Sequence, residues 1–270
     1  MKSLQSKFSC FTCPKKVSLL YLQIIKDDWS ENMERLDKII SNLGYGSRKD
    51  VKSFAKKGLI EVDGVIVKDN GMIVDPEKAS IKINGEEILY RKYIYLMMNK
   101  PDGVISATHD NRDETVIDLL EVDHQAFDPF PVGRLDKDTV GLLLLTNDGE
   151  LNHRLIAPKW HVDKVYYAKI NKKVDEKDVE AFKKGITLED GYKCLEANLE
   201  ILSSNDEGAE IRLTIQEGKF HQVKRMFEAV GKQVVYLKRE EFGGLLLDPE
   251  LEEGEYRELT DEELNVLKSY

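Results

Sequence analysis

The chain has 270 residues, of which 41% are apolar and 33% are charged, and its formal net charge is −10. This composition is typical of a soluble globular protein, and the length favours one large domain plus a smaller one. No apolar run reaches the roughly 18 residues that a membrane-spanning helix needs, and three cysteines are too few for a disulfide framework and suit a reducing cytoplasm.

The excess of acidic residues is concentrated near the end of the sequence. Residues 248–263 hold nine acidic side chains and one arginine, which supply eight of the ten excess negative charges. The rest of the chain is nearly balanced and contains local basic clusters. Because exposed charges act over only about 8–10 Å at physiological salt, the net charge does not exclude a nucleic-acid partner.

Residues 1–32 are expected to be a disordered or loosely packed leader, since their pattern matches nothing downstream. Cys10 and Cys13 have the spacing of half a zinc site, but the second half is missing, so no metal is expected. The apolar stretch 17–25 follows two lysines but lacks a small-residue cleavage site. We therefore expect no export, no membrane contact and a cytoplasmic location.

Two short helices are predicted next. Apolar residues at positions 36, 39, 40 and 43 form one face of a helix that Gly44 ends. Ser47 is the predicted N-cap of the second helix, with Asp50 in its first turn, and Gly58 ends it. One side of this helix is basic and has a spacing that can follow a phosphate backbone; a solvated lysine face is the alternative. The basic face comprises Arg48, Lys49, Lys52 and Lys56.

Short strands complete this first part of the chain. The turn pair Asp63-Gly64 between apolar runs at 60–62 and 65–67 predicts a β-hairpin, and a further strand is expected at 81–83. Residues 84–92 begin with Asn-Gly and are highly charged, which indicates a linker. The first domain with its linker is therefore predicted to span 33–92.

The remainder, 93–270, mixes strands with helices. Strands are predicted at 95–98, 142–146, 165–170, 197–202 and 211–215, and helices at about 149–157, 176–184 and 221–230. Strands of mixed spacing with interspersed helices favour an α+β fold with a mixed, mostly antiparallel sheet.

The first domain resembles a known RNA-binding module. The motifs RLDKII at 35–40, GSRK at 46–49 and GLIEVDG at 58–64 are similar to the small domain first described in ribosomal small-subunit protein S-four. The resemblance covers roughly 33–88 and implies RNA binding through Arg35 and the basic face of the second helix. It implies no particular reaction, since one module can serve many proteins.

The segment PVGRLDKDTVGLLLLTNDG at 131–149 is the most informative in the chain. Two glycines bracket a polar loop that leads directly into a buried strand, so its side chains have rigid support. This segment is similar to the carboxylate motif of pseudouridine synthases. MNKPDGVIS at 98–106, KVY at 164–166 and EGKFHQVKRM at 217–226 resemble that family's other motifs, in the family's order.

The resemblance implies that the catalytic residue is Asp136. Its carboxylate acts as a nucleophile at the sugar or removes the proton from the 2′ carbon, and the sequence leaves both routes open. Lys224 is the first choice for its cationic partner, and Arg225 the second. Tyr166 is expected to stack on the uracil and to assist proton removal from carbon 5. Isomerisation oxidises nothing and imports no group, so no cofactor is expected.

Further RNA contacts are expected around this site. Arg134 occupies the gap left by the extruded base or holds a phosphate, and Lys100 in the first motif is assigned to RNA binding. His221 is given a structural or RNA-contact role, because the sequence pairs it with no nucleophile.

The variant HQVKRM at 221–226, with GEYR at 254–257, resembles the branch that acts on 16S ribosomal RNA, the RsuA type. The expected partner is therefore 16S rRNA or a small-subunit assembly intermediate, bound by a monomer. Two alternatives stay open at this point: the same reaction on large-subunit rRNA, and a non-catalytic RNA-binding assembly factor.

Overall fold

The computed structural model describes residues 33–88 and 90–270, and the chain divides into two compact units between Tyr90 and Arg91. The predictions for the leader, including Cys10 and Cys13, lie outside the described residues. Within them, no helix is both long and apolar enough to cross a membrane.

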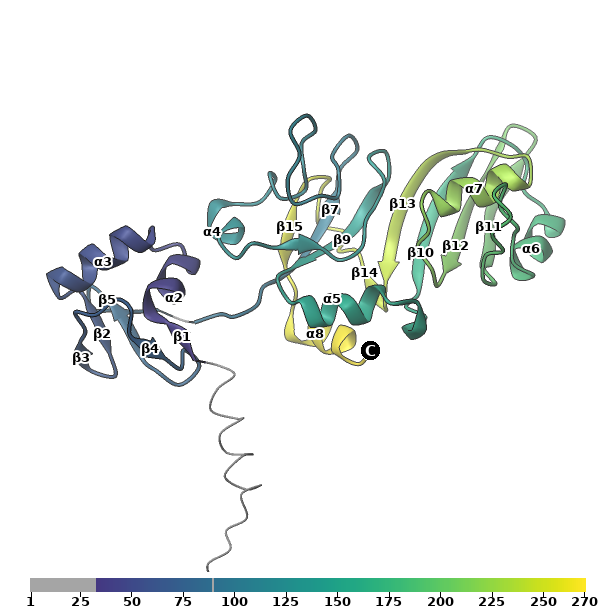
Figure 1. Ribbon diagram of the computed structural model, residues 1–270. Coiled ribbons are helices and arrows are strands. Elements are labelled where there is room, and N and C mark those ends of the chain that lie inside the picture. Colours follow the sequence, from purple (N-terminus) through teal and green to yellow (C-terminus); the bar gives the residue numbers. More distant parts are fainter. Residues whose placement is uncertain (1–32, 89) are drawn as a thin grey trace, which may run out of the picture. The chain divides into compact units, whose positions relative to one another are not determined.

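The N-terminal unit has a helical pair and two small sheets (Figure 1). Ser47 caps the second helix through a capping box with Asp50, and Gly58 ends it with a positive φ of 70°, as predicted. Leu36, Ile39 and Ile40 are fully buried against the sheet residues. The elements are β1 (Glu34–Arg35), α2 (Leu36–Asn42), α3 (Arg48–Lys57), β2 (Ile60–Val62), β3 (Val65–Ile66), β4 (Ile73–Val74), β5 (Ile81–Ile83) and β6 (Glu86–Ile88).

The predicted linker begins too early. Asn84 and Gly85 form the turn of a hairpin between β5 and β6, both with positive φ, and β6 adds an edge strand to the sheet order β3-β2-β5-β6. An Asn-Gly pair serves a hairpin turn better than a linker because both residues tolerate positive φ. The linker prediction is therefore wrong for residues 84–88.

The C-terminal unit is built on a nine-stranded mixed sheet with the main order β11-β12-β10-β13-β9-β7-β15. Every pairing is antiparallel except β13 with β9, which confirms the α+β expectation. The strands are β7 (Tyr95–Lys100), β8 (Phe130–Pro131), β9 (Val140–Thr146), β10 (Lys164–Ile170), β11 (Asn198–Asn205), β12 (Gly208–Ile215), β13 (Val234–Phe242), β14 (Leu245–Leu246) and β15 (Tyr256–Glu258).

Each face of this sheet has its own apolar core. Alternate residues of β9 divide between them, with Leu143 and Leu145 in one core and Leu142 and Leu144 in the other. The helices on the first face are α6 (Glu176–Lys183) and α7 (Gln222–Ala229); those on the second are α5 (Gly149–Ile156) and α8 (Asp261–Lys268), and α4 (Val122–Gln125) lies in the connection from β7 to β8 (Figure 1).

Strand β13 was not predicted, and it positions the site. It lies between β9, which follows the carboxylate loop, and β10, which carries Tyr166. Two segments distant in the sequence therefore approach each other across a single intervening strand.

Candidate active site

The carboxylate loop, residues 132–139, joins β8 to β9 and presents Asp136 at a partly exposed position. The Asp136 side chain is 25% exposed, while its neighbour Leu135 is buried in the core of the first sheet face. An anchored leucine beside the carboxylate restricts the conformations of the loop.

The first motif holds this loop in place. Ser106 Oγ donates to the Leu135 carbonyl at 3.0 Å and accepts from the Leu135 amide at 3.1 Å. The amide of Gly103 donates to the Lys137 carbonyl at 3.0 Å. The loop backbone is thus bonded from two directions to the segment that follows β7.

Lys100 does the same from inside the protein, and its assignment to RNA binding is corrected here. Its side chain is fully buried, and its ammonium donates to the carbonyls of Pro101, Lys137 and Thr139 at 2.8, 3.1 and 3.0 Å. Burial lowers the pKa of Lys100 to about 8. An ammonium with three backbone partners and no exposure has no donor left for RNA.

Lys224 of α7 is the cation that meets the carboxylate loop. Its Nζ lies 3.2 Å from Oδ2 of Asp136 and 2.5 Å from Oδ1 of Asp138, and its side chain is 18% exposed. Burial alone lowers the pKa of Lys224, but the hydrogen bond to Asp138 and the charge of Asp136 outweigh it and raise that pKa. The same hydrogen bond lowers the pKa of Asp138. Lys224 therefore stays charged beside Asp136.

Arg225 does not compete for this role. Its Nη2 lies 2.5 Å from Oδ2 of Asp190, a different carboxylate. The choice left open by the sequence falls on Lys224, and the alternative placement of Arg225 beside Asp136 is wrong.

Sequence reasoning missed two neighbours of Asp136. Asp138 shares Lys224, as described above, and His221 places its Nε2 3.6 Å from Oδ1 of Asp136. The sequence paired His221 with no nucleophile, whereas the structure places it beside the carboxylate of Asp136. Residues 221–222 indicated in the sequence only where the helix begins. The contact between His221 and Asp136 joins residues 85 positions apart, so it depends on the tertiary fold.

The turn before α7 is fixed by Gln222. This buried amide accepts from the Lys219 backbone at 2.8 Å and donates to Glu217 at 2.7 Å. Glu217 is also buried and accepts from the Leu195 amide and the Tyr192 hydroxyl. The backbone between Gly218 and His221 is thus held at the edge of the site.

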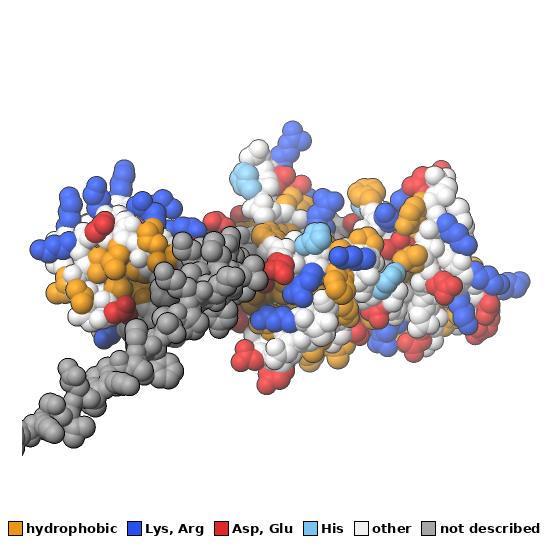
Figure 2. All heavy atoms as spheres, turned by 60° about the horizontal axis from the view of Figure 1, so that its bottom comes forward, with side chains coloured by type: hydrophobic (Ala, Val, Ile, Leu, Met, Phe, Trp, Pro, Cys, Tyr) orange, Lys and Arg blue, Asp and Glu red, His pale blue; other side chains and the backbone are white. Residues whose placement is uncertain are grey.

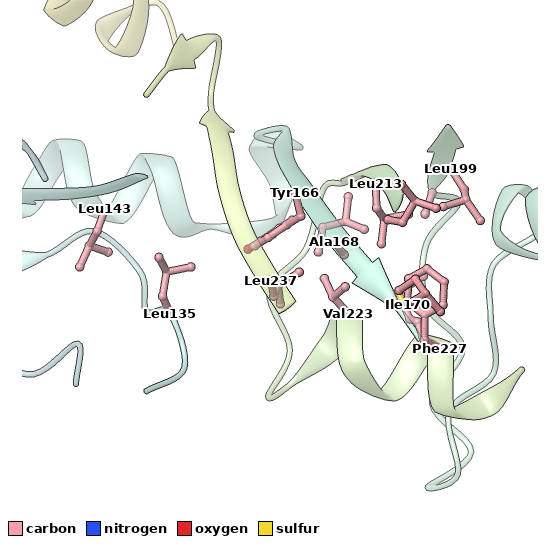
Figure 3. Close-up of a cluster of buried hydrophobic side chains, with 14 of the residues drawn as sticks. Leu135, Leu143, Tyr166, Ala168, Ile170, Leu199, Leu213, Val223, Phe227 and Leu237 are labelled. Atoms are coloured by element: carbon pink, nitrogen blue, oxygen red, sulfur yellow. The ribbon is translucent and has the colours of Figure 1, made fainter. Parts of the chain in front are cut away.

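Tyr166 extends from β10 toward β13, with Leu237 and Val223 nearby (Figure 3). It is only 7% exposed, but it lines a hollow of about 60 Å³ together with Asp136, His221 and Arg134. We call this space the catalytic hollow. The predicted carboxylate and aromatic residues therefore border one space.

A larger space adjoins the hollow and shares Arg134, Tyr166, Gly218 and Lys219 with it. This basic cavity has a volume of about 480 Å³, within the range of ligand pockets. Its one lining carboxylate, Glu217, is already bonded within the protein. Its cationic lining residues are Arg134, Lys159, Lys164, Lys219 and Arg239.

Arg239 on β13 is a functional candidate that the sequence did not reveal. It is 2% exposed, its Nε donates to the Leu142 carbonyl at 2.8 Å, and it is the cross-strand partner of Tyr166, with whose side chain it interacts. Burial lowers the pKa of Arg239. Its Nη2 has no hydrogen-bond partner among the described residues.

Arg134 is exposed at the border of both spaces and forms no ion pair with any residue of the described segments. In the N-terminal unit, Arg48, Lys49, Lys52 and Lys56 are all exposed on α3. Lys and Arg side chains gather along one edge of this unit in Figure 2. Arg35 is half exposed and bonds to Asp37.

The arrangement offers a carboxylate, a paired cation and an aromatic ring at one hollow. Across 33–88 and 90–270, no three His, Cys, Asp or Glu side chains are grouped as metal ligands. Such a site can support covalent or proton-transfer chemistry at a sugar, with an aromatic surface for a base.

Comparison with known proteins agrees with this arrangement. Residues 94–229 match the family model described as RNA pseudouridylate synthase, and residues 34–79 match the S4 domain. A crystal structure of a pseudouridylate synthase is 36% identical, with a TM-score of 0.61, and the match covers 86% of this chain and 99% of that one.

Similar proteins have related names. An uncharacterised RNA pseudouridine synthase of Bacillus subtilis is 52% identical over 86% of this chain and 98% of its own length. Ribosomal small subunit pseudouridine synthase A of Vibrio cholerae is 41% identical, with 85% and 97% covered. Ribosomal large subunit pseudouridine synthase B of Bacillus subtilis is 39% identical, with 88% and 96% covered. The chain belongs to the RNA pseudouridylate synthase family and carries an N-terminal S4 domain.

Proposed function

We propose that this enzyme isomerises a specific uridine of 16S ribosomal RNA to pseudouridine, with Asp136 as its catalytic carboxylate. The observation that carries the proposal is the contact of Asp136 with Lys224 at a hollow that Tyr166 also lines. The ammonium of Lys224, 3.2 Å away, lies where it can offset the negative charge of a carboxylate that acts at the sugar.

The reaction is an internal exchange of bonds. The bond from the anomeric carbon to nitrogen 1 breaks, the uracil turns, and carbon 5 bonds to the anomeric carbon. The proton on carbon 5 then leaves and nitrogen 1 takes up a proton, so the formula of the nucleotide is unchanged. Asp136 acts at the sugar, either as the nucleophile or as the base at the 2′ carbon. Tyr166 lines the same hollow, where its ring can hold the turning base and its hydroxyl can assist the final proton transfer.

The target nucleotide must leave any helical stack to reach Asp136, which costs a few kcal/mol and least in an unpaired loop. We assign the space that receives it to the catalytic hollow and the adjoining basic cavity. The cations of that cavity suit the phosphates of the chain, and Arg134 at the border suits the gap that the base leaves. The exposed lysines of α3 supply further phosphate contacts without sequence choice.

The choice of the small subunit rests on two motifs and on named relatives. The HQVKRM form at 221–226 and GEYR at 254–257 resemble the branch that acts on 16S rRNA, and relatives named for the small subunit are 38–41% identical. A relative named for the large subunit is 39% identical, so large-subunit rRNA is the second candidate.

The test uses 16S and 23S rRNA transcribed without modifications, each alone and bound to ribosomal proteins. Pseudouridine is mapped by carbodiimide treatment and primer extension after incubation with wild type, Asp136→Asn and Asp128→Asn. Asp128 is an exposed aspartate with φ of 51°, a conformation that asparagine accepts, so its variant is a matched control.

One new stop in 16S rRNA with wild type and Asp128→Asn, absent with Asp136→Asn, is the expected result. A stop only in 23S rRNA would overturn the small-subunit assignment. No stop in any substrate would overturn the catalytic proposal and favour a binding factor. A stop that survives in Asp136→Asn would overturn the role assigned to Asp136.

A further inference from the structure

Two aromatic side chains, Phe220 and His221, lie at the edge of the catalytic hollow and belong to none of the apolar cores. Phe220 is 73% exposed, although Phe182, Phe227 and Phe242 of the same unit are buried. Its ring stacks on that of His221, with centroids 3.8 Å apart and an angle of 18° between the planes. A single exposed apolar residue is common on a protein surface, so exposure alone decides nothing.

The backbone beneath the pair indicates that its position is imposed. His221 has a φ of 49°, a left-handed conformation that is unfavourable for a non-glycine residue and persists only where the surrounding structure enforces it. The enforcing contacts are those of Gln222 to Lys219 and Glu217, described above. A buried amide and a buried carboxylate are thus used to hold Phe220 and His221 outward.

The pair is continuous with the reaction centre. His221 lines the catalytic hollow, with Nε2 3.6 Å from Asp136, while Phe220 stacks on the imidazole and is not among the residues that line the hollow. Tyr166 lines the hollow and is the aromatic surface that the proposed reaction uses for the target base. The exposed ring of Phe220 is therefore free to contact a part of the substrate that stays outside the hollow when the target base enters it.

The charges nearby define that occupant. Lys219 directly precedes Phe220 and is exposed, and Arg134 borders the same hollow with no ion pair among the described residues. Flat aromatic rings next to cations are the features with which proteins bind unpaired nucleotides, by stacking on the base and attracting the phosphate.

We propose that Phe220, stacked on His221, is a platform for a second unpaired nucleobase, adjacent to the target uridine in the RNA strand. This inference rests on the proposed RNA substrate and adds a second base-binding position to it. Because stacking accepts any base, the platform supplies affinity and holds the strand open rather than reading its sequence.

The test measures binding without turnover. A fluorescein-labelled hexauridylate RNA is titrated, by fluorescence anisotropy, into Asp136→Asn proteins that also carry Phe220→Ala, Phe220→Tyr or Val122→Ala. Val122 is 79% exposed on α4 and is the control for removal of an exposed apolar side chain. A second probe has one uridine flanked on both sides by abasic residues.

Phe220→Ala is expected to raise the Kd of hexauridylate about 5- to 150-fold, the measured range for loss of one stacked base. Phe220→Tyr and Val122→Ala should stay within about twofold of their parent. With the abasic-flanked probe, Phe220→Ala should have no effect, because the stacked base is already gone. Equal losses on both probes, or no loss on hexauridylate, would overturn the platform.

Failure of the proposed function leaves a different result. Wild type that forms no pseudouridine in rRNA refutes the proposed reaction, whereas the comparison of the two probes judges Phe220 without any turnover. Since Phe220 is exposed, the melting temperature of Phe220→Ala should match that of wild type.

Discussion

Gly141 of β9 lies directly opposite Arg239 of β13, where the only parallel pairing of the sheet occurs in the described chain. A Cβ at Gly141 would lie 2.3 Å from the Arg239 carbonyl oxygen and 2.9 Å from its amide nitrogen, and φ at this residue is +100°. The start of β9, which follows the carboxylate loop, therefore approaches β13 more closely than a residue with a Cβ would permit. This close approach sets how near the loop with Asp136 lies to β13 and to Tyr166 on the next strand.

Gly141→Ala should consequently damage both stability and activity. Backbone strain and overpacking together are expected to cost about 2–4 kcal/mol, and the displaced loop should lower kcat. Thermal melting and single-turnover pseudouridine formation measure the two effects. Gly149→Ala is the control, because Gly149 begins α5 with nothing within 4 Å of an added Cβ, and alanine favours a helix.

Arg239 is expected to act as a positioning residue between Tyr166 and β9. Arg239→Met removes the contact with Leu142 and Tyr166 but fills similar space, and replacing a buried charge by an apolar residue is often neutral for stability. We therefore expect an unchanged or higher melting temperature together with a kcat reduced about 10- to 100-fold, and a KM within threefold.

Arg239→Lys should not restore this loss, since an ammonium lacks the planar fork that reaches two strands. A melting temperature that falls in parallel with kcat in Arg239→Met would contradict the positioning role and leave only a structural one.

The role of the contact between Lys224 and Asp136 is tested by comparing variants of Lys224 and of the adjacent Arg225. Lys224→Met leaves Asp136 and Asp138 without their shared cation, so the two like charges repel and the loop loses its partner on α7. We expect kcat to fall about 100-fold, comparable to loss of one electrostatic contact in other active sites. Arg225→Met, which breaks the pair with Asp190 instead, should lower kcat less than fivefold. Equal losses in the two variants would refute the assignment to Lys224.

Local signals of the sequence predicted much of this molecule. The Ser47 cap, the Gly58 terminus and the Asp63-Gly64 hairpin each depend on residues within a few positions, and the structure contains all three. The loop around Asp136 was also recognisable, because its glycines and the apolar run after it are contiguous.

What the sequence concealed depends on contacts between distant strands. In β13 the run Lys238–Glu241 is entirely charged, which hides the alternation of a buried strand, although Leu237, Arg239 and Phe242 are buried. Lys100 resembles an exposed cation until its three carbonyl partners, two of them nearly 40 residues away, are known. His221 near Asp136 was hidden for the same reason.

Because Lys100 is buried, we expect both the free energy of unfolding and kcat to depend on pH. Its pKa is lowered to about 8 in the folded protein, below the unfolded value near 10.4. Between these two pH values the unfolded chain binds more protons, so the Lys100 contribution to the free energy of unfolding becomes more favourable as pH rises. Deprotonation also leaves two N–H donors for three carbonyls, two of which belong to the carboxylate loop, so kcat should fall above pH 8.

Denaturant titrations from pH 7 to 11 compare wild type with Lys100→Met. The free energy of unfolding of wild type, relative to that of Lys100→Met, should rise from pH 8 upward and level off above pH 10.4. A difference that is constant with pH would show that Lys100 keeps its proton in the fold.

The basic face of α3 is expected to determine how RNA affinity responds to salt. Arg48, Lys49, Lys52 and Lys56 are exposed, and replacing all four by Gln removes up to four phosphate contacts. The slope of log affinity against log salt should therefore become shallower by about 3. Since such contacts carry no sequence information, kcat on saturating RNA and the position of the modified uridine should not change.

A control of equal charge replaces Lys173, Lys177, Lys183 and Lys184 by Gln, all exposed in or near α6 of the other unit. This control should keep the slope of wild type within about 1, because loss of net charge alone acts weakly through a Debye length of about 8–10 Å. If both quadruple variants flatten the slope equally, α3 provides only general attraction. If only the α3 variant does, the S4 unit binds the phosphate backbone directly through the basic face of α3.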